Sequence, residues 1–436
     1  MSDSTRRTFF KSAAAAAIAT QAHPILGAND RVAVGIVGLG GRGNNHMDFY
    51  LKIPAANITA LCDVNQAAVE RGQAKVSKGG ANPTPKPYSD MRKLFEDKEI
   101  DAVSFATPNH WHALGAIWAM QAGKDVYCEK PASYNMFEGY QMVAAARKYN
   151  RMCQIGSQSR SIAHKVKAMQ LLQEGVIGKV YMAKGLCFKR RKSIGHKADE
   201  PTPAGLNWDM FLGPAPMRAF NELRFKYNWH WFWDTGNGDI GNQGVHEMDI
   251  LLWGLGKTTL PRSVFSSGGK LVYNDDQETP NTQMVTYDWG DGVVGQFEVR
   301  GLLTGSEGGL VKKGNVVGDL FYGSDGWMAV DGNGFQVYKG DNDEKVMDEK
   351  KSDGDTVPHM ENFLGSVKSR NHKDLHAEIE IGARAAALCH MANISYRVGR
   401  KLNWDDGTRK FTGDSEATKL MTRNPYRAPY TVPEKV

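Results

Sequence analysis

The sequence has few cysteines, little excess of one charge and, beyond its first 30 residues, no long hydrophobic run. Its five cysteines among 436 residues are odd in number and lack paired spacing, so we expect buried free thiols rather than a disulfide scaffold. The net charge of +6 is small and dispersed, which argues against a nucleic-acid partner. No segment after the N-terminus reaches the apolar length of a membrane span.

The N-terminus carries a twin-arginine segment. Arg6 and Arg7 precede an apolar, alanine-rich run, and small residues offer a cleavage site near Ala22 or Ala28. Charge, order and length are those of a Tat export signal; the alternative is an amphipathic helix that contains two arginines. We therefore expect residues 1–28 to be a signal peptide and the mature protein to be periplasmic. Because the Tat route carries folded proteins, a cofactor can be loaded in the cytoplasm and the thiols can stay reduced.

Residues 29–156 alternate between short apolar segments and helical patterns. Such alternation is typical of an α/β fold with a doubly wound parallel sheet, and right-handed crossovers leave few topologies. We expect a Rossmann nucleotide-binding domain here. The predicted strands are 31–37, 57–62, 101–106, 125–128 and 152–155, and the predicted helices are 42–53, 66–77, 90–96, 112–122 and 136–149, with a Gly/Pro-rich loop over 79–87.

After Gly156 the pattern changes to strands with few helices between them. It predicts an α+β substrate-binding domain over residues 157–400 with an open, mostly antiparallel sheet. The remaining residues, 401–436, are expected to be a tail or arm with an extended, proline-rich end. The predicted elements of this domain are strands 179–188, 263–273, 283–288, 293–300, 318–322 and 327–330, a helix over 163–174, and helices over 360–367 and 377–398 that we expect to pack on this domain.

A glycine-rich turn joins the first strand to the first helix. Gly38 permits the tight turn, Gly40 lets the backbone approach a pyrophosphate, and Gly43 allows close contact between helix and strand. Asp63 ends the second strand 20 residues after Gly43, where its carboxylate can bind the adenosine ribose. No arginine follows it directly to bind a 2′-phosphate. The sequence thus predicts NAD rather than NADP; the alternative is a plain glycine turn beside a solvated aspartate.

Three further motifs, together with this turn, resemble one family. They are Thr-Pro-Asn-His-Trp-His over 107–112, Glu-Lys-Pro over 129–131 and Gly-Asn-Gln-Gly-Val-His over 241–246. With them the chain resembles the glucose–fructose oxidoreductase / inositol dehydrogenase (Gfo/Idh/MocA) family over about residues 30–400. The resemblance implies hydride chemistry at a sugar or polyol carbon and, because the family's open sheet often makes oligomer contacts, a homo-oligomer.

The polar residues of these motifs complete the expected cofactor site. Ligands on open α/β sheets bind beyond the carboxyl ends of the strands, where several of these residues lie. The cofactor-binding residues that we expect are Gly38, Gly40, Gly41, Arg42, Gly43, Asp63, Thr107, Asn109, His112 and Glu129.

Lys130 is the first candidate catalytic residue. It lies between Glu129 and Pro131, in a stiff stretch of backbone. Its ammonium can polarise or help deprotonate a substrate hydroxyl if burial lowers its pKa. From the residues alone, a structural ion pair with Glu129 is equally open, and the family motif favours the functional role.

His246 is the best candidate general base, because an imidazole titrates near neutral pH. The alternative is a core histidine bonded to backbone, and no metal is expected because no His or Cys lies at ligand spacing from it. In the family an aspartate commonly lies four residues earlier and orients this histidine; here that position is Asn242. An amide can hold the ring but carries no charge, which weakens the case for simple dehydrogenase chemistry. Asp239 or Asp249 could supply the missing charge.

Two clusters are candidates for sugar recognition. The aromatic run over 228–234 can stack on the apolar C–H faces of a sugar ring, although such a run can equally be domain core. The basic run over 189–192 is normally a solvated loop, but folded over the cleft it would hold a carboxylate or sulfate on the sugar. The substrate-binding residues that we expect are Trp229, His230, Trp231, Trp233, Arg190 and Arg191.

Three functions fit these observations. The first is an oxidoreductase that uses tightly bound NAD(H) for hydride transfer at a carbohydrate carbon. The second is a redox-neutral, NAD-dependent glycoside hydrolase or lyase, a class in the same wider group, and it is favoured by export, since no nicotinamide pool exists outside the cytoplasm. The third is a non-catalytic sugar-binding protein, which only Asn242 supports. All three take a small carbohydrate as partner.

Overall fold

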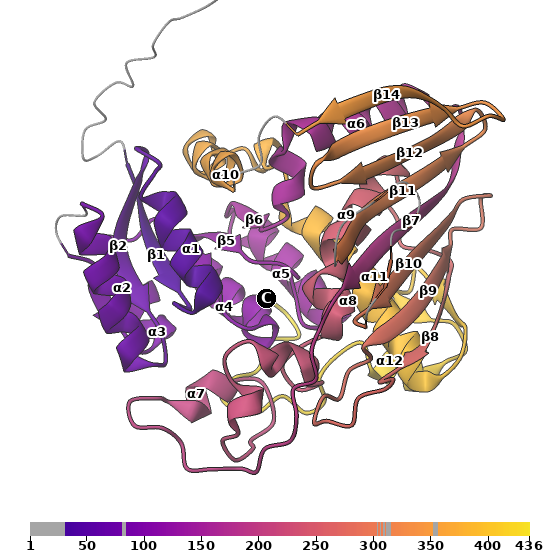
Figure 1. Cartoon of the computed structure of the whole chain (residues 1–436). Coiled ribbons are helices and arrows are strands. Elements are labelled where there is room, and N and C mark those ends of the chain that lie inside the picture. Colours follow the sequence, from indigo (N-terminus) through magenta and orange to yellow (C-terminus); the bar gives the residue numbers. More distant parts are fainter. Residues whose placement is uncertain are drawn as a thin grey trace, which may run out of the picture.

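The computed structural model describes residues 31–80, 84–302, 304–305, 307, 310, 315–351 and 356–436. The predicted signal peptide, residues 1–28, lies outside this range, so export through the Tat route stays a prediction. Figure 1 shows two sheets with helices packed between them.

The first domain is a six-stranded parallel sheet in the order β3-β2-β1-β4-β5-β6. The predicted Rossmann architecture is confirmed. Its strands are β1 (Val32–Val37), β2 (Ala56–Cys62), β3 (Lys86–Tyr88), β4 (Ala102–Phe105), β5 (Asp125–Cys128) and β6 (Cys153–Ile155), and its helices are α1 (Gly41–Tyr50), α2 (Gln66–Lys78), α3 (Met91–Glu96), α4 (Asn109–Gln121) and α5 (Met136–Lys148).

The second domain is built on a ten-stranded sheet in the order β14-β13-β12-β11-β7-β10-β9-β8-β15-β16. Only β7 and β10 pair in parallel among its described strands, so the predicted mostly antiparallel sheet is confirmed. Along β9, buried and more exposed residues alternate, as expected of a sheet with one face covered. Helices α9 and α11 pack on its inner face, toward the first domain (Figure 1).

The elements of this domain are bounded as follows. The strands are β7 (Val180–Lys189), β8 (Ser263–Gly269), β9 (Thr282–Asp288), β10 (Val294–Arg300), β11 (Asn315–Gly323), β12 (Gly326–Asp331), β13 (Gly334–Lys339), β14 (Glu344–Lys350), β15 (Leu402–Asp405) and β16 (Lys410–Phe411). The helices are α6 (Ala163–Gln173), α7 (Trp208–Leu212), α8 (Gly238–Asn242), α9 (Gly244–Gly254), α10 (Val357–Ser369), α11 (Ile379–Val398) and α12 (Ser415–Lys419).

Several of these elements were not expected. Strand β3 overlaps the end of the predicted loop over 79–87, because a three-residue edge strand that contains a proline has no alternation to detect. Strand β14 is largely exposed and highly charged, and helix α9 is buried on almost every side, so neither shows the usual period. Where a tail was expected from residue 401, β15 and β16 instead extend the sheet.

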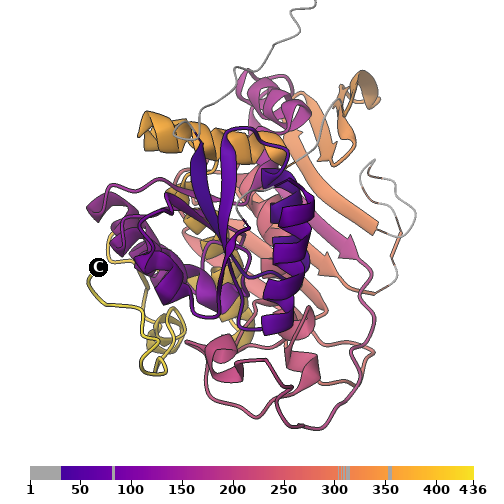
Figure 2. The ribbon, with the colours of Figure 1, turned by 90° about the vertical axis from the view of Figure 1, so that its left-hand side faces the viewer.

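Helix α10 packs on the first domain, not on the second as its sequence position suggested. Met360, Phe363 and Leu364 are at most 1% exposed and join the core formed around β1 and β2. The Phe363 ring meets the Tyr127 ring of β5 at 5.8 Å. Figure 2 shows α10 lying across the indigo strands of the first domain. The second half of the chain therefore returns to complete the first domain's core.

The C-terminal residues also return to the first domain. Tyr430 and Val432 are buried in the core that includes α4 and β5, and the chain ends near α4 and α5 (Figure 1). The five cysteines are buried and unpaired, which confirms the predicted free thiols. Within the described ranges, no helix is both long and apolar enough to cross a membrane.

Phe363→Ala is expected to lower the free energy of unfolding by about 3–5 kcal/mol, because it leaves a cavity in the core. The loss should appear in the transition of the Rossmann domain, followed by urea titration and by NAD binding. Phe265→Ala, at a 46% exposed position on β8, is the matched control. A Phe363→Ala effect confined to the second domain would contradict the packing described here.

Candidate active site

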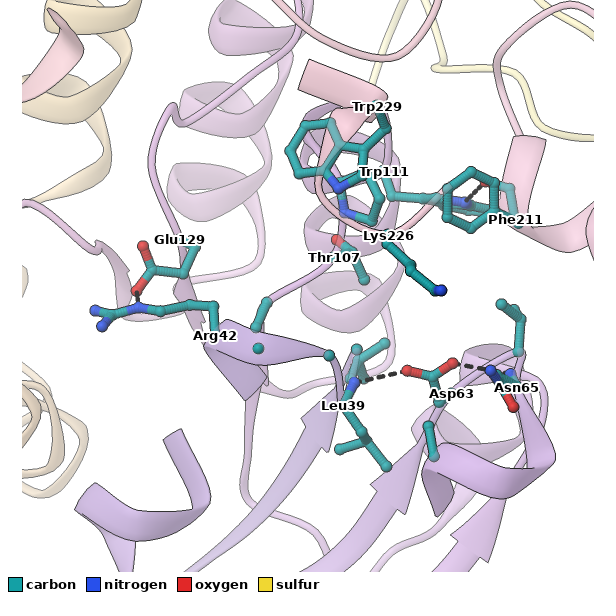
Figure 3. Close-up of a pocket in the computed structure, with 18 of the residues that line it drawn as sticks. Leu39, Arg42, Asp63, Asn65, Thr107, Trp111, Glu129, Phe211, Lys226 and Trp229 are labelled. Atoms are coloured by element: carbon teal, nitrogen blue, oxygen red, sulfur yellow. Dashed lines mark hydrogen bonds and ion pairs between the residues drawn. The ribbon is translucent and has the colours of Figure 1, made fainter. Parts of the chain in front are cut away.

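A cavity of about 710 Å³ lies between the glycine turn and the segment over residues 210–242. Figure 3 shows Arg42 and Glu129 on one side of this cavity and Asp63 and Asn65 on the other. Trp229 and Phe211, from the second domain, close it from above (Figure 3). The predicted residues that line it are Gly38, Gly40, Gly41, Arg42, Asp63, Thr107, Asn109, Glu129, Lys130, Trp229, His230 and Asn242.

The glycine turn is built for close approach of a ligand. Gly38 has a φ of +85°, in the region that favours glycine. A Cβ on Gly43 would lie 1.9 Å from the Gly38 carbonyl oxygen, so the first turn of α1 can pack here only without a side chain. Gly40 and Gly41 instead face open space, with no described atom within 4 Å of a Cβ. This is a cradle that a pyrophosphate fits, at the N-terminus of a helix.

Asp63 closes the other end of the cavity. Its carboxylate accepts hydrogen bonds from the backbone N–H of Leu39 at 2.7 Å and of Asn65 at 2.8 Å. Burial raises the pKa of Asp63, and these two donors and Arg71 offset part of the rise. The Asp63 carboxylate keeps lone pairs that can accept hydrogen bonds from ribose hydroxyls, whereas its negative charge would repel a 2′-phosphate. Arg71, which the sequence expectation overlooked, also lines this end.

Thr107 and Asn109 follow β4 and face the same cavity. The Thr107 hydroxyl is buried without a hydrogen-bond partner among the described residues, which fits a position that a ligand completes. The amide of Asn109 donates to the side chain of Asn237 at 2.9 Å. His112 does not line the cavity: its ring nitrogens contact the carbonyls of Pro131 (2.7 Å) and Thr107 (2.9 Å). It therefore holds the backbone beside Lys130 in place.

Glu129 is buried and held by α1. Its carboxylate accepts hydrogen bonds from Arg42 Nε at 2.7 Å and lies 3.0 Å from His46 Nε2. Burial opposes its ionisation, but Arg42 and His46 outweigh that effect and hold the pKa of Glu129 well below its usual range. Oε1 of Glu129 also accepts from the Gln158 amide at 3.1 Å, and Oε2 accepts from the backbone N–H of Lys130 at 3.3 Å. None of these hydrogen bonds comes from the Lys130 ammonium.

Lys130 points at the second domain. Its ammonium donates to the Asn242 carbonyl at 2.6 Å and lies 3.5 Å from the Asn242 side-chain oxygen. Within the described part of the chain it has no carboxylate partner at ion-pair distance, so the alternative of a structural ion pair with Glu129 is excluded. Burial lowers the pKa of Lys130, and Glu129 offsets part of that effect. The result is a desolvated amine on the cavity wall, suited to exchange a proton.

His246 lies one turn beyond Asn242, on α9, and is not among the residues that line the cavity. Burial and the nearby Lys130 charge hold the pKa of His246 well below its ordinary value. The Asn242 amide donates to the Tyr227 hydroxyl at 2.9 Å rather than to this ring. Neither Asp239 nor Asp249 replaces the missing acid, because each is held by an arginine.

The ion pairs of Asp239 with Arg191 and of Asp249 with Arg160 have short donor–acceptor distances. Asp239 accepts from Arg191 at 2.6 and 2.8 Å, and Asp249 accepts from Arg160 at 2.8 Å. Arg191 is thus neutralised by a carboxylate and does not line the cavity. Arg190 does not line it either, and its guanidinium lies 5.9 Å from the Tyr273 ring. The structure does not bring the predicted basic pair to the cavity.

The residues of the aromatic run lie in three places: the cofactor cavity, the core and a second cavity. Trp229 and His230 line the cavity and stack with ring centroids 3.6 Å apart. Trp231 is 4% exposed and belongs to the core. Trp233 lines a separate cavity on the far side of the segment. Of the four predicted substrate residues in this run, only two therefore face the cofactor site.

Residues over 205–227 form a cover that the motif analysis missed. The Gln66 N–H donates to the Gly205 carbonyl, and the Asn207 N–H donates to the Val64 carbonyl, both at 2.9 Å. These bonds pin the cover beside Asp63. Its cavity-lining members are Met210, Phe211, Phe225, Lys226 and Tyr227. The density of aromatic residues in this stretch was the available signal.

The C-terminal tail fixes this cover from behind. Arg427 donates to the carbonyls of Gly213 at 2.9 Å and of Asp209 at 2.7 Å, and Tyr430 donates to the Asp209 carboxylate at 3.0 Å. The cover is therefore tied both to the Rossmann domain and to the tail.

Comparisons with known proteins identify both halves of the chain. Residues 32–157 match the model of an oxidoreductase family with an NAD-binding Rossmann fold (GFO_IDH_MocA). Residues 157–304 and 323–432 match the C-terminal α/β domain of the same family.

Curated relatives match over less than half of their length. A glycosyl hydrolase family 109 protein of Saccharopolyspora erythraea is 32% identical over 211 residues, 45% of each chain. An alpha-N-acetylgalactosaminidase of Shewanella oneidensis is 26% identical over 174 residues, 38% of each chain. Among solved structures, the WlbA dehydrogenase of Bordetella pertussis, in complex with NADH and UDP-GlcNAcA, has a TM-score of 0.64. At 20% identity over 86% of this chain and 99% of that chain, it shows a shared fold.

Substitutions of Gly43, which packs against backbone, and of Gly40, which faces open space, are expected to impair different properties of the protein. Gly43→Ala should lower the stability of the protein even without nucleotide, because the new methyl group meets the Gly38 carbonyl. Gly40→Ala should keep the stability of the nucleotide-free protein and lose NAD binding. Thermal unfolding with and without NAD, together with the nucleotide content of the purified protein, separates the two. Equal NAD binding by Gly40→Ala and the parent would contradict this cradle.

Proposed function

Since the chain belongs to the Gfo/Idh/MocA oxidoreductase family, which binds NAD, we propose that it transfers a hydride at a carbohydrate carbon while NAD(H) stays bound. The observation that carries this proposal is the placement of Lys130. It is desolvated, has no carboxylate partner within the described ranges and faces the cavity that holds the glycine turn and Asp63. NAD, when bound there, accepts a hydride and can return it.

Lys130 accepts or donates the proton that accompanies the hydride. An alcohol that loses a hydride must also lose its hydroxyl proton, and a desolvated amine beside the reacting oxygen can take it. In the reverse direction the ammonium donates to the carbonyl oxygen. Asn242 positions the amine through its carbonyl at 2.6 Å, and the Tyr227 hydroxyl, bonded to the Asn242 amide, extends this polar wall toward the substrate.

The aromatic side of the cavity suits a sugar ring. Trp229 offers a flat apolar face, and polar groups of Tyr227 and His230 lie next to it in the cavity wall. The contact of His230 Nδ1 with the Tyr227 carbonyl, at 2.5 Å, requires a proton on that nitrogen. Burial holds the pKa of His230 well below its ordinary value, so the neutral ring keeps Nε2 as an acceptor for a substrate hydroxyl.

The cover supports retention of the dinucleotide. A protein exported through the Tat route, as the N-terminus predicts, would find no nicotinamide pool to exchange with. The bonds from Gln66 and Asn207 close the adenosine end of the cavity, and Arg427 holds the cover from behind. A cofactor enclosed in this way has to be regenerated by a second substrate or by the return of the hydride.

The return of the hydride is the second candidate function, and the relatives named glycosyl hydrolase family 109 favour it. In that reaction a ring carbon is oxidised, the glycosidic bond is eliminated, water adds and the hydride returns. The Lys130 amine would serve the oxidation and the final reduction alike. The net reaction is hydrolysis and consumes no cofactor.

One experiment tests both candidates. The purified mature protein is examined for bound NADH by absorbance and then incubated, without added nucleotide, with aryl glycosides or with pairs of sugars. Turnover that requires a second sugar as acceptor supports the oxidoreductase, and release of the aglycone supports the glycosidase. A protein without bound nucleotide, which turns over only with added NAD, would contradict retention.

Lys130→Met should reduce either activity by about 100-fold or more and leave the nucleotide content unchanged, with Lys167→Met on α6 as the control. Because burial lowers the pKa of Lys130, sugar oxidation by the parent should increase with pH through a pKa below that of an ordinary lysine. Lys130→Arg, which stays protonated, should be inactive across this range. An active Lys130→Arg variant would exclude the proposed proton transfer.

Arg427→Ala should loosen the cover and increase the rate of NAD(H) dissociation by about tenfold, since it removes charge-assisted hydrogen bonds to Asp209 and Gly213. The rate is measured by dilution of the loaded protein into a nucleotide scavenger. Lys435→Ala, an exposed change in the same tail, is the matched control. Identical dissociation from both variants would show that the tail does not hold the cover.

A further inference from the structure

A second cavity, of about 500 Å³, lies between α11, the loop after β5 and the start of the C-terminal tail. We propose that this cavity binds an anionic sugar residue, one that carries a carboxylate or a sulfate. Trp233, Arg397 and Arg423 are the side chains that carry the proposal. The site does not depend on the chemistry proposed at Lys130, because its evidence is separate and its test reads binding directly.

A rigid wall separates the two cavities. Asn109 lines the first and Asn237 lines the second, and their side chains are joined by a hydrogen bond of 2.9 Å. Asn237 also donates to the Tyr134 carbonyl and accepts from Asn393 through its own carbonyl, both at 2.9 Å. With its side chain and carbonyl both engaged, Asn237 is fixed, and the second cavity is a compartment of its own.

The second cavity carries an excess of positive charge. Arg397, Arg423 and Lys419 line it, and within the described part of the chain no carboxylate lies at ion-pair distance from any of them. Asp234 is the acidic residue in the lining, and it is already paired with Arg218. His390 adds no charge, since burial lowers its pKa to about 4.

Glu138, behind the wall, only partly compensates this charge. Burial raises the pKa of Glu138 to about 7, although the nearby charge of Arg423 offsets part of the rise. It accepts its hydrogen bonds from Tyr134, Asn135 and Tyr426 and not from the arginine. An anion in the cavity would therefore find cations that the protein itself leaves unpaired.

The two guanidiniums are fixed by aromatic rings. Arg423 lies 4.3 Å from the Tyr134 ring centroid and donates to the Asp234 carbonyl at 2.7 Å, while its Nε has no acceptor among the described residues. Arg397 lies 5.3 Å from the Trp233 ring. Such stacking preorganises donors for a planar or tetrahedral oxyanion.

The size and lining favour a sugar over a bare ion. An inorganic anion would fill a small part of 500 Å³, a volume in the usual range for small-molecule sites. The half-buried Trp233 ring offers an apolar face, and the polar residues Asn135, Asn393 and Thr422 line the same cavity. Stacking on one side with hydroxyl recognition on the other is the pattern of carbohydrate binding. This also gives a role to Trp233, which does not reach the cofactor cavity.

The test is calorimetric titration of the purified, nucleotide-containing protein with four probes: glucuronate, glucose 6-sulfate, glucose and inorganic sulfate. Binding of glucuronate, of glucose 6-sulfate or of both, with glucose and inorganic sulfate at least about tenfold weaker, supports the site, and the stronger probe identifies the anionic group. Equal binding of glucose would overturn the proposal. Binding of inorganic sulfate alone, an adventitious ion only, would overturn it too, as would no binding at millimolar concentration.

Variants locate the binding. Arg397→Gln, at an exposed position on α11 that the fold tolerates, should weaken the preferred probe by about tenfold. Arg384→Gln, on the same helix but outside the cavity, should leave its affinity unchanged. Lys130→Met should abolish turnover and keep this affinity, so failure at one site is distinguishable from failure at the other. An unchanged affinity in Arg397→Gln would exclude the second cavity as the binding site.

Discussion

The geometry of the active site depends on one buried carboxylate, that of Glu129, and on the groups of α1 that satisfy it. Arg42 and His46 bind this carboxylate at 2.7 and 3.0 Å, and a Cβ on Gly156 would lie 2.8 Å from it, so the neighbouring strand end has to be glycine. Arg42, His46 and Gln158 all contact Oε1 of Glu129, and the Lys130 ammonium donates instead to the Asn242 carbonyl. Loss of Arg42 would leave a buried charge without its main partner, at a cost of several kcal/mol. The helix that begins at the glycine turn thus contributes both to the cofactor cradle and to the surroundings of the Lys130 amine.

The sequence predicts the first domain better than the second for a physical reason. Parallel strands buried on both faces are continuous apolar runs, and amphipathic helices between them restore a clear period. Helix α9 shows no period because nearly every side of it is buried, and β14 shows none because most of it is exposed. The packing of α10 on the first domain could not be foreseen, since periodicity identifies an apolar face but not the surface that covers it. The sequence pattern around Phe363 would be the same whichever domain this residue contacted.

At the site, the sequence predicts the positions of residues that belong to one short motif. It does not predict contacts between segments that are far apart in the sequence. Gly38, Gly40 and Asp63 are positioned by one strand–turn–helix unit, so their placement follows from local rules. The partner of Lys130 does not, because Asn242 is 112 residues away. The aromatic run shows the same limit: a short 3₁₀ helix over Asn228–Trp231 ends before Trp233, and Trp229 and Trp233 line different cavities. The neutralisation of Arg191 by Asp239 likewise appears only when both segments are folded.

The cover over the cofactor connects the fold to the choice of reaction. Residues over 205–227 cover the end of the groove beside Asp63, and Arg427 of the tail holds this cover, which favours the proposed retention of the nicotinamide cofactor. Two chemistries remain compatible with an enclosed carrier: reoxidation by a second sugar in the same cavity, or return of the hydride to the same sugar. Both need one acid–base group that works in both directions, and a desolvated lysine fixed by a neutral carbonyl meets this requirement better than an imidazole without an orienting acid. Under the proposed function, the replacement of the family's aspartate by Asn242 moves the proton chemistry from His246 to Lys130, whose ammonium donates to the Asn242 carbonyl.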